Sequence, residues 1–218
     1  MELRRDVFLP AAEGAAAAIV VSAKMLNPET KQEEITAEGA KIVKAINALH
    51  VVASTETLEN AIDLGTQIGT LLTRMEILRA KMLKRSADLK AVAGVVDREI
   101  QNGNALVEMM KANNLGNASL DQEKKIQGQW KLHQQMLTGW MEQRDQLHET
   151  LRGEALEAHA AWEAMITEMA PYQTRTLLAL RKELGFPINE NSYQRRLDEA
   201  RETAKKLLDD SRNAAKQL

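Results

Sequence analysis

Apolar and small residues recur at alternating steps of four and three along the segment 61–110. Eleven of the fifteen positions are apolar and two are glycine; the series is Ala61, Gly65, Ile68, Leu72, Met75, Arg79, Met82, Ser86, Leu89, Ala93, Val96, Ile100, Gly103, Val107 and Met110. A period of about 3.5 residues, kept over about seven heptads, is typical of a helix that packs in a left-handed coiled coil. The pattern therefore predicts one long helix with a single packing seam.

The same spacing returns between residues 126 and 172. The positions are Ile126, Trp130, His133, Leu137, Trp140, Arg144, Leu147, Leu151, Ala155, Ala158, Trp162, Met165, Met169 and Tyr172. Two consecutive steps of four around Leu151 predict a local unwinding of the supercoil. Pro171 predicts a kink or a division of this second helix, because proline removes a backbone donor and clashes with the preceding turn. A weaker break is expected near Ser54.

Residues that favour helix ends interrupt the apolar pattern early in the chain. Asn27 and Pro28 suit the first turn of a helix, and Thr30 with Glu33 matches a capping box. These residues predict that a short helix from about Ala11 ends here and that a long helix follows.

Two further breaks lie near the middle and the end of the chain. The segment 113–117 contains three Asn and one Gly, which tolerate the left-handed conformation, and Ser119 with Gln122 matches a second capping box. Gly185 followed by Pro187 is a stop signal. The sequence thus predicts a helical hairpin with its turn in the first segment and a helix end at the second.

Together these patterns predict an all-α fold: an elongated antiparallel coiled-coil helical hairpin with a short helical bundle at its base. The expected organisation is an N-terminal Ala-rich helix and linker at 1–29, the long hairpin at 30–184 with its tip near 113–118, and a C-terminal amphipathic helix at 185–218.

Charge supports the antiparallel pairing. Residues 74–90 hold six cations and two carboxylates, a net charge of +4, whereas residues 142–168 hold seven carboxylates and two arginines, a net charge of −5. A turn centred near Leu115 pairs positions whose numbers sum to about 230, so the two segments largely overlap. We interpret them as solvated faces that compensate each other, with an anion-binding surface on 74–90 as the alternative.

Composition narrows the functional classes. Charged residues make up 28% of the chain and aromatic residues 3%, the net charge is −2, and there is no cysteine. This excludes disulfides and thiolate chemistry and disfavours nucleic acid as a partner. We favour a soluble, cytoplasmic protein over a secreted one, because Asp6, Pro10 and Glu13 interrupt the pattern of a signal peptide.

No motif for catalysis or cofactor binding is recognisable. There is no nucleophile elbow and no phosphate-binding loop. His133, His148 and His159, together with Asp145 and Glu163, do not supply the two Glu-x-x-His motifs that a di-iron bundle needs. We therefore expect no enzyme activity, no catalytic residues, no cofactor and no metal.

The second helix carries more apolar residues than one seam can bury. The candidate interaction surface is Trp130, Leu132, Met136, Leu137, Trp140 and Met141. Large exposed apolar patches mark sites of association. The leading hypothesis is a non-enzymatic coiled-coil scaffold protein that forms a homo-oligomer, a dimer or larger, and mediates protein–protein interaction.

A membrane-acting helical protein is the alternative, either a component like that of a pore-forming toxin or a dimer that binds curved membranes. The candidate membrane segment is Ala15, Ala16, Ala17, Ala18, Ile19, Val20 and Val21. The continuous apolar stretch 14–23 has about ten residues, whereas a spanning helix needs about 20. Insertion at the bilayer interface is therefore the expected mode.

Overall fold

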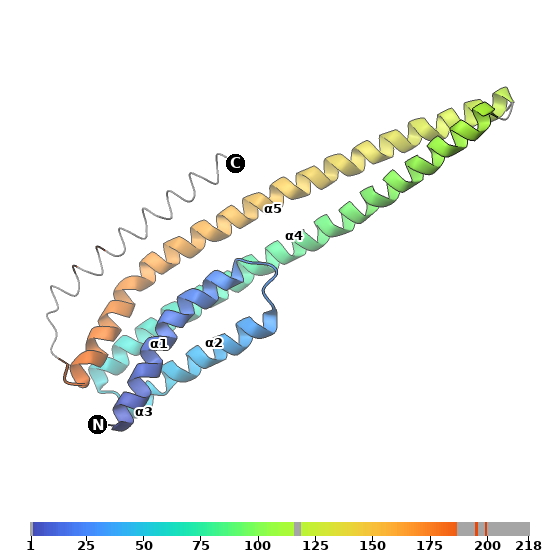
Figure 1. Ribbon diagram of the computed structural model, residues 1–218. Coiled ribbons are helices and arrows are strands. Elements are labelled where there is room, and N and C mark those ends of the chain that lie inside the picture. The colour runs from blue at the N-terminus through green and yellow to red at the C-terminus, as the bar shows by residue number, and fades with distance from the viewer. Residues whose placement is uncertain (1, 116–118, 187–194, 196–198, 200–218) are drawn as a thin grey trace. The chain divides into compact units, whose positions relative to one another are not determined.

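The computed structural model describes residues 2–115, 119–186, 195 and 199. Helices hold 93% of these residues, and no strand occurs among them, so the all-α prediction is confirmed. The elements are α1 (Glu2–Met25), α2 (Gln32–Asn47), α3 (Leu49–Val52), α4 (Thr55–Leu115) and α5 (Leu120–Glu183) (Figure 1). The predicted C-terminal helix at 185–218 lies almost entirely outside the described residues.

The chain divides into two compact units. Unit 1 comprises Met1–Lys24, Thr30–Thr73 and Trp162–Leu218, and unit 2 comprises Met25–Glu29 and Arg74–Ala161. Both long helices contribute to both units.

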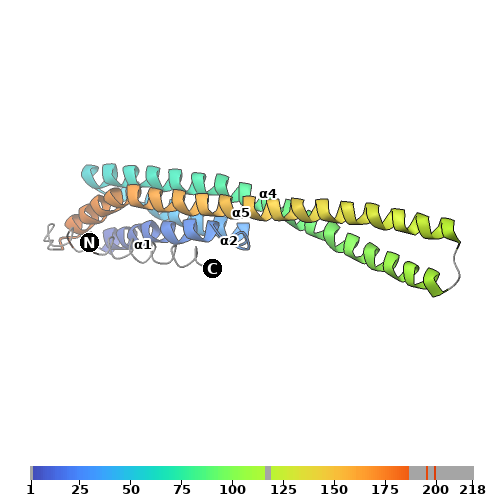
Figure 2. The same cartoon turned by 90° about the horizontal axis from the view of Figure 1, so that it is seen from above.

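Unit 1 is a helical bundle with an apolar core. Phe8 and Ala11 of α1 form a buried cluster with Leu49 of α3, Ala61 of α4 and Leu180 of α5. Figure 2 shows α1 alongside α2, and the two backbones approach closely at Gly14, where an added Cβ would lie 3.4 Å from Cβ of Ala45. Small side chains on α1 permit this close packing.

Unit 2 contains a helical hairpin in which α4 from Arg74 onward packs against the first part of α5. The predicted seam forms the contact. All fourteen positions predicted for the second helix are buried or half-buried, and in the first helix only Ile100, at 46% exposure, is exposed. The 3.5-residue spacing thus identified the packing face of both helices.

The register of the hairpin differs from the expected one. His133 lies against Gly103, and Arg85 forms an ion pair with Glu154 at 3.2 Å. The residue numbers of these facing pairs sum to 236 and 239, rather than about 230. The difference arises because α4 ends at Leu115 and α5 begins at Leu120, which moves the centre of the turn beyond Leu115.

Two predicted helix ends are confirmed at the two termini of α5. The backbone N–H of Gln122 donates to Oγ of Ser119 at 3.4 Å, as the second capping box requires. At the other end of α5, Gly185 has a φ of 71°, and the N–H groups of Gly185 and Phe186 donate to the carbonyls of Lys182 and Arg181. This pair of bonds is the Schellman motif.

The weak break near Ser54 is also present, because α3 ends at Val52 and α4 begins at Thr55. Oγ of Ser54 accepts a hydrogen bond from the N–H of Thr57 at 3.4 Å, and the main-chain oxygen of Ser54 accepts one from Leu58 at 2.8 Å. Ser54 therefore caps α4.

Two predictions for the N-terminal part are wrong. Helix α1 begins at Glu2 rather than near Ala11 and contains Pro10 in its interior. Phe8, at 1% exposure, belongs to the core, so its burial offsets the local cost of the proline. Helix α2 begins at Gln32 with Lys31, not Thr30, at its N-cap.

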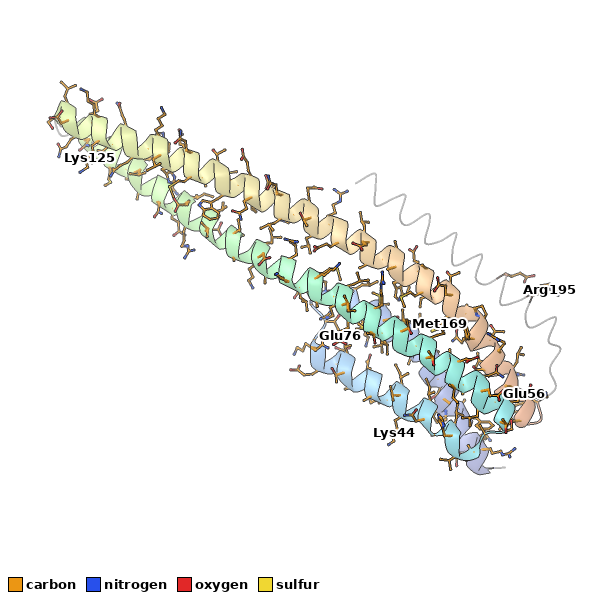
Figure 3. The ribbon with its side chains drawn as sticks, turned by 180° about the vertical axis from the view of Figure 1, so that it is seen from behind. Lys44, Glu56, Glu76, Lys125, Met169 and Arg195 are labelled. Carbon is orange, nitrogen blue, oxygen red and sulfur yellow. The ribbon has the colours of Figure 1, made fainter. Side chains whose placement is uncertain are left out.

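Helix α5 continues through Pro171 as one element, so the proline does not divide it. The orange C-terminal part of α5 bends in Figure 1, as a kink would require. Buried residues lie on both sides of the proline: Met169, labelled in Figure 3, is 1% exposed and Thr174 is 5% exposed. Their packing holds the helix together where propensity alone would end it.

Candidate interaction surfaces

The predicted interaction surface separates into a packed part and an exposed part. Trp130, Leu137 and Trp140 are half-buried in the seam of unit 2. Leu132 and Met136 are 58% and 46% exposed. Because they are four residues apart on α5, their side chains are neighbours on one flank of the helix. We call these two residues the Leu132–Met136 patch.

Met141 is also exposed, at 39%, but it does not extend this patch. It is nine residues from Leu132, which at 100° per residue places it on the opposite side of the helix. The six candidate residues therefore form a seam with two separate flanks rather than one continuous face.

His133 lies inside the hairpin, in the seam where the sequence predicts it. It is 7% exposed, its Nδ1 is 3.2 Å from Oε2 of Glu99, and its ring centroid is 5.8 Å from that of Trp130. A Cβ added at Gly103 would lie 2.5 Å from its Nε2, so glycine is needed for this close approach. His148 and His159 are exposed.

The described residues do not form a metal-binding cluster around these histidines. Among the residues that the structure describes, no group of three or more His, Asp or Glu side chains is placed to hold a metal ion.

The candidate membrane segment is part of the packing surface of α1. Ala15, Ala18 and Val21 are buried, whereas Ala16 and Val20 are exposed, and Ala17 and Ile19 are half-buried. The helix is longer than its apolar stretch. Arg4–Met25 covers 22 residues with a mean hydropathy of 1.5, which by length and composition is enough to cross a membrane. The expectation that this region is too short is corrected, although a core helix passes the same test.

Polar contacts hold the C-terminal half of α1 in unit 1. Nε1 of Trp162 donates to Oγ of the fully buried Ser22 at 2.9 Å, and Nζ of Lys24 donates to Glu34 and Glu38, each at 2.8 Å. The hydrogen bond to Glu34, followed by that to Glu38, raises the pKa of Lys24, and the same ammonium lowers the pKa of Glu34. None of these partners could be assigned from sequence.

An open groove of about 500 Å³ runs between α1 and α2. Ala17, Val20 and Ile42 are among the apolar residues that line it, and Lys24 and Lys41 are among the charged ones. Its lining contains neither histidine nor a hydroxyl side chain.

Unit 2 contains a buried arginine that sequence reasoning placed only as an exception in the seam. Arg79 is 3% exposed and donates to the main-chain oxygens of Met25 at 3.1 Å, Asn27 at 2.6 Å and Pro28 at 3.4 Å. The signal in the sequence was a cation at a seam position where most of the other residues are apolar or small. The guanidinium satisfies carbonyls at the end of α1 and in the following loop, so its role is structural.

Two apolar surfaces are exposed among the described residues: the Leu132–Met136 patch on α5 and the side of α1 that carries Leu9 and Val20. Comparison of the chain with protein-family models, with curated proteins and with solved structures finds no match.

Proposed function

We propose that this chain is a non-catalytic helical module that self-associates and mediates protein–protein interaction. The observation that carries the proposal is the Leu132–Met136 patch, two large apolar side chains one turn apart on a helix whose own partner covers a different side. Association with a second copy removes this patch from water and requires no chemistry from the chain.

Burial of the patch supplies part of the driving force for association. Complete burial of one large apolar side chain is worth roughly 1.5–3 kcal/mol. A two-fold interface buries the patch of both copies, so four side chains contribute. Their sum is comparable with the lower estimates of the cost of association, about 4 kcal/mol and above. The apolar contact can therefore offset much of that cost.

The test is multi-angle light scattering at tens of micromolar. We expect the unmodified chain to be a dimer or larger, and we expect Leu132→Ser/Met136→Ser to weaken association at least tenfold while helicity measured by circular dichroism is unchanged. The control is Leu83→Ser/Met109→Ser, which alters two side chains of unit 2 that are 39% and 51% exposed and lie on α4. Equal association of the patch variant and the unmodified chain would reject the patch as the interface.

A membrane-acting role is the second candidate, and one observation favours it. Leu9 and Val20 of α1 are 54% and 56% exposed, and they are eleven positions apart, about three full turns, so they lie on one face. Together with the length of the apolar helix, this face supports docking of α1 at a bilayer interface.

Liposome flotation distinguishes the two roles. A membrane-acting chain floats with vesicles, and removal of residues 1–27 abolishes flotation. Because Phe8 and Val21 are buried, this deletion disturbs the core. The sharper variant is Leu9→Ser/Val20→Ser, which changes exposed side chains only. A chain that stays with the soluble fraction under all conditions has no such role.

A further inference from the structure

We propose that copies of this chain also join side by side through charge, with the outer face of α4 in unit 2 of one copy docking on the outer face of α5 of the next. The inference deepens the proposed self-association and rests on it for the choice of partner. It is carried by residues other than the Leu132–Met136 patch.

The outer face of α4 is cationic with an apolar centre. Its residues follow one another at steps of three, four and three, and all are exposed; they are Arg74, Ile77, Lys81 and Lys84. Ile77 is 56% exposed. Within the described part of the chain, none of the three cations has a hydrogen-bonded or ion-paired carboxylate. We call this set the basic stripe.

The outer face of α5 is anionic and also has one apolar residue. Its exposed members follow at steps of three and four; they are Glu142, Asp145, Glu149, Arg152 and Leu156. Leu156 is 56% exposed. Arg144 and Arg152 pair with Asp145 and Glu149 at 2.9 Å and 4.0 Å, and three carboxylates against one arginine leave the set with a net charge of −2. We call it the acidic stripe.

The two stripes cannot neutralise each other within one hairpin. Ile77 is two residues from both Met75 and Arg79, so at 100° per residue it points directly away from the seam. Glu149 stands in the same relation to Leu147 and Leu151 of α5. Each stripe therefore faces away from the partner helix, and Figure 3 shows side chains projecting outward along both helices of this hairpin.

The direct charge contact between the two segments bears this out. Arg85, one of the cations between 74 and 90, forms an ion pair with Glu154 of α5, and Arg85 does not belong to the basic stripe. The predicted compensation between the two segments is seen in this pair, whereas both stripes lie on the outer faces of the helices.

A second copy supplies the missing complement. The hairpin register, set by Arg85 against Glu154 and by Gly103 against His133, brings Ile77 within two helical turns of the level of Leu156. In this register the carboxylates of the acidic stripe lie level with about residues 87–97 of α4, beyond Lys84. A parallel copy displaced along the hairpin axis by about ten residues, about 15 Å, sets these carboxylates beside Lys81 and Lys84. Ile77 and Leu156 then still lie within two helical turns of each other. Because different faces meet and each copy is displaced along the axis, the contact is heterologous and repeats into an open filament.

The contact should depend strongly on salt. Exposed charges interact over a Debye length of about 8 Å at physiological ionic strength and about 3 Å at 1 M. We expect sedimentation velocity of the unmodified chain to show species larger than a dimer at 50 mM NaCl, and these species should dissociate at 500 mM NaCl.

Charge reversal tests the pairing. The first variant is Arg74→Glu/Lys81→Glu/Lys84→Glu, which makes both stripes acidic, and the second is Glu142→Lys/Asp145→Lys/Glu149→Lys, which makes both basic. Each variant alone should lose the larger species, with association weakened at least tenfold, because like charges then meet. An equimolar mixture should regain them, since the altered stripe of one variant complements that of the other.

Failure of this inference is distinguishable from failure of the proposed function. Leu132→Ser/Met136→Ser should lose the salt-resistant dimer and keep the salt-sensitive contact, whereas either charge variant should do the reverse. Larger species that persist in both charge variants would overturn the inference, and so would a mixture that remains as small as its components. A chain that is monomeric at both salt concentrations would overturn both proposals.

Discussion

Nη1 of Arg79 lies 2.6 Å from the main-chain oxygen of Asn27, although 52 positions separate the two residues in the chain. The same atom donates to the carbonyl of Met25, the last residue of α1. The final carbonyls of a helix have no partner within the helix. One buried cation thus ends α1 and holds the following loop within unit 2.

Replacing this cation should destabilise the chain measurably. Arg79→Met keeps most of the stem but leaves carbonyls without their charged donor, and hydrogen bonds to charged groups are worth about 1.5–3 kcal/mol. We expect the free energy of unfolding in urea to fall by about that amount. Arg74→Met, at an exposed position on the same helix, should change it by less than about 0.5 kcal/mol. Equal effects of both substitutions would contradict the role of Arg79.

The close approach at Gly103 predicts an unusual response to alanine. Alanine normally stabilises a helix interior by roughly 0.5–1 kcal/mol relative to glycine, and Gly94→Ala, with open space around the added Cβ, should show this gain. Gly103→Ala should instead destabilise, because its Cβ displaces the buried His133 from Glu99. The comparison is made by chemical denaturation. In a His133→Ala background the two substitutions should become equivalent, and a persistent difference would place the cause elsewhere.

Glu183 should make the stability of the folded chain depend on pH in the acidic range. Oε1 of Glu183 accepts a hydrogen bond from the N–H of Ser54 at 2.6 Å. Burial is the largest single effect and acts to raise the pKa of Glu183, but the hydrogen bonds from Ser54 and Thr57 and the charge of Arg4 together outweigh it, so the pKa lies below its ordinary value of 4.5. A lowered pKa stabilises the folded chain above the ordinary value, and this contribution is lost as the pH falls through the lowered one.

We therefore expect Glu183→Gln to reduce stability near neutral pH and to flatten the loss of stability below pH 4.5. Thermal unfolding between pH 7 and pH 3 measures both effects. Glu56→Gln is the control, because the side chain of Glu56 is 66% exposed in its contact with Lys182. An unchanged slope in the Glu183 variant would show that other carboxylates dominate the acid response.

The ion pair between Arg85 and Glu154 tests the register of the hairpin. Both side chains are partly exposed, at 34% and 21%, so the pair is worth about 1 kcal/mol or less. Arg85→Glu and Glu154→Arg should each lower the free energy of unfolding, and the double exchange should restore part of the loss. Additive losses in the double variant would indicate that the two residues do not face each other.

The sequence was sufficient for the features that depend on local spacing. The 3.5-residue period identified the packing face because burial along a helix follows its own periodicity, and Gly185 and Ser119 marked helix ends because capping involves neighbouring residues. The register was displaced because the expected turn was centred near Leu115, whereas its centre depends on where α4 ends as well as on where α5 begins. The Asn- and Gly-rich segment 113–117 does not show at which residue α4 ends.

Contacts between residues that are far apart in the sequence could not be predicted from local spacing. Pro10 favours the start of a helix. The burial of Phe8 nevertheless extends α1 toward the N-terminus, to the residues that precede the proline. The partner of Trp162 is Ser22, 140 positions away, and a serine among alanines carries no sign of such a bond. The outward direction of both charged stripes also became evident only once the seam was known to be buried.

The small residues on the packing face of α1 also lower the free-energy cost of separating that helix from the rest of unit 1. Ala11, Ala15 and Ala18 are each nearly fully buried, yet each removes little surface from water, so α1 separates from unit 1 at a lower cost than a helix of the same length that packs through leucine. Local opening follows the weakest buried contacts. The amide hydrogens of α1 should accordingly exchange with deuterium through a cooperative opening that leaves the leucine- and methionine-lined part of α4 protected.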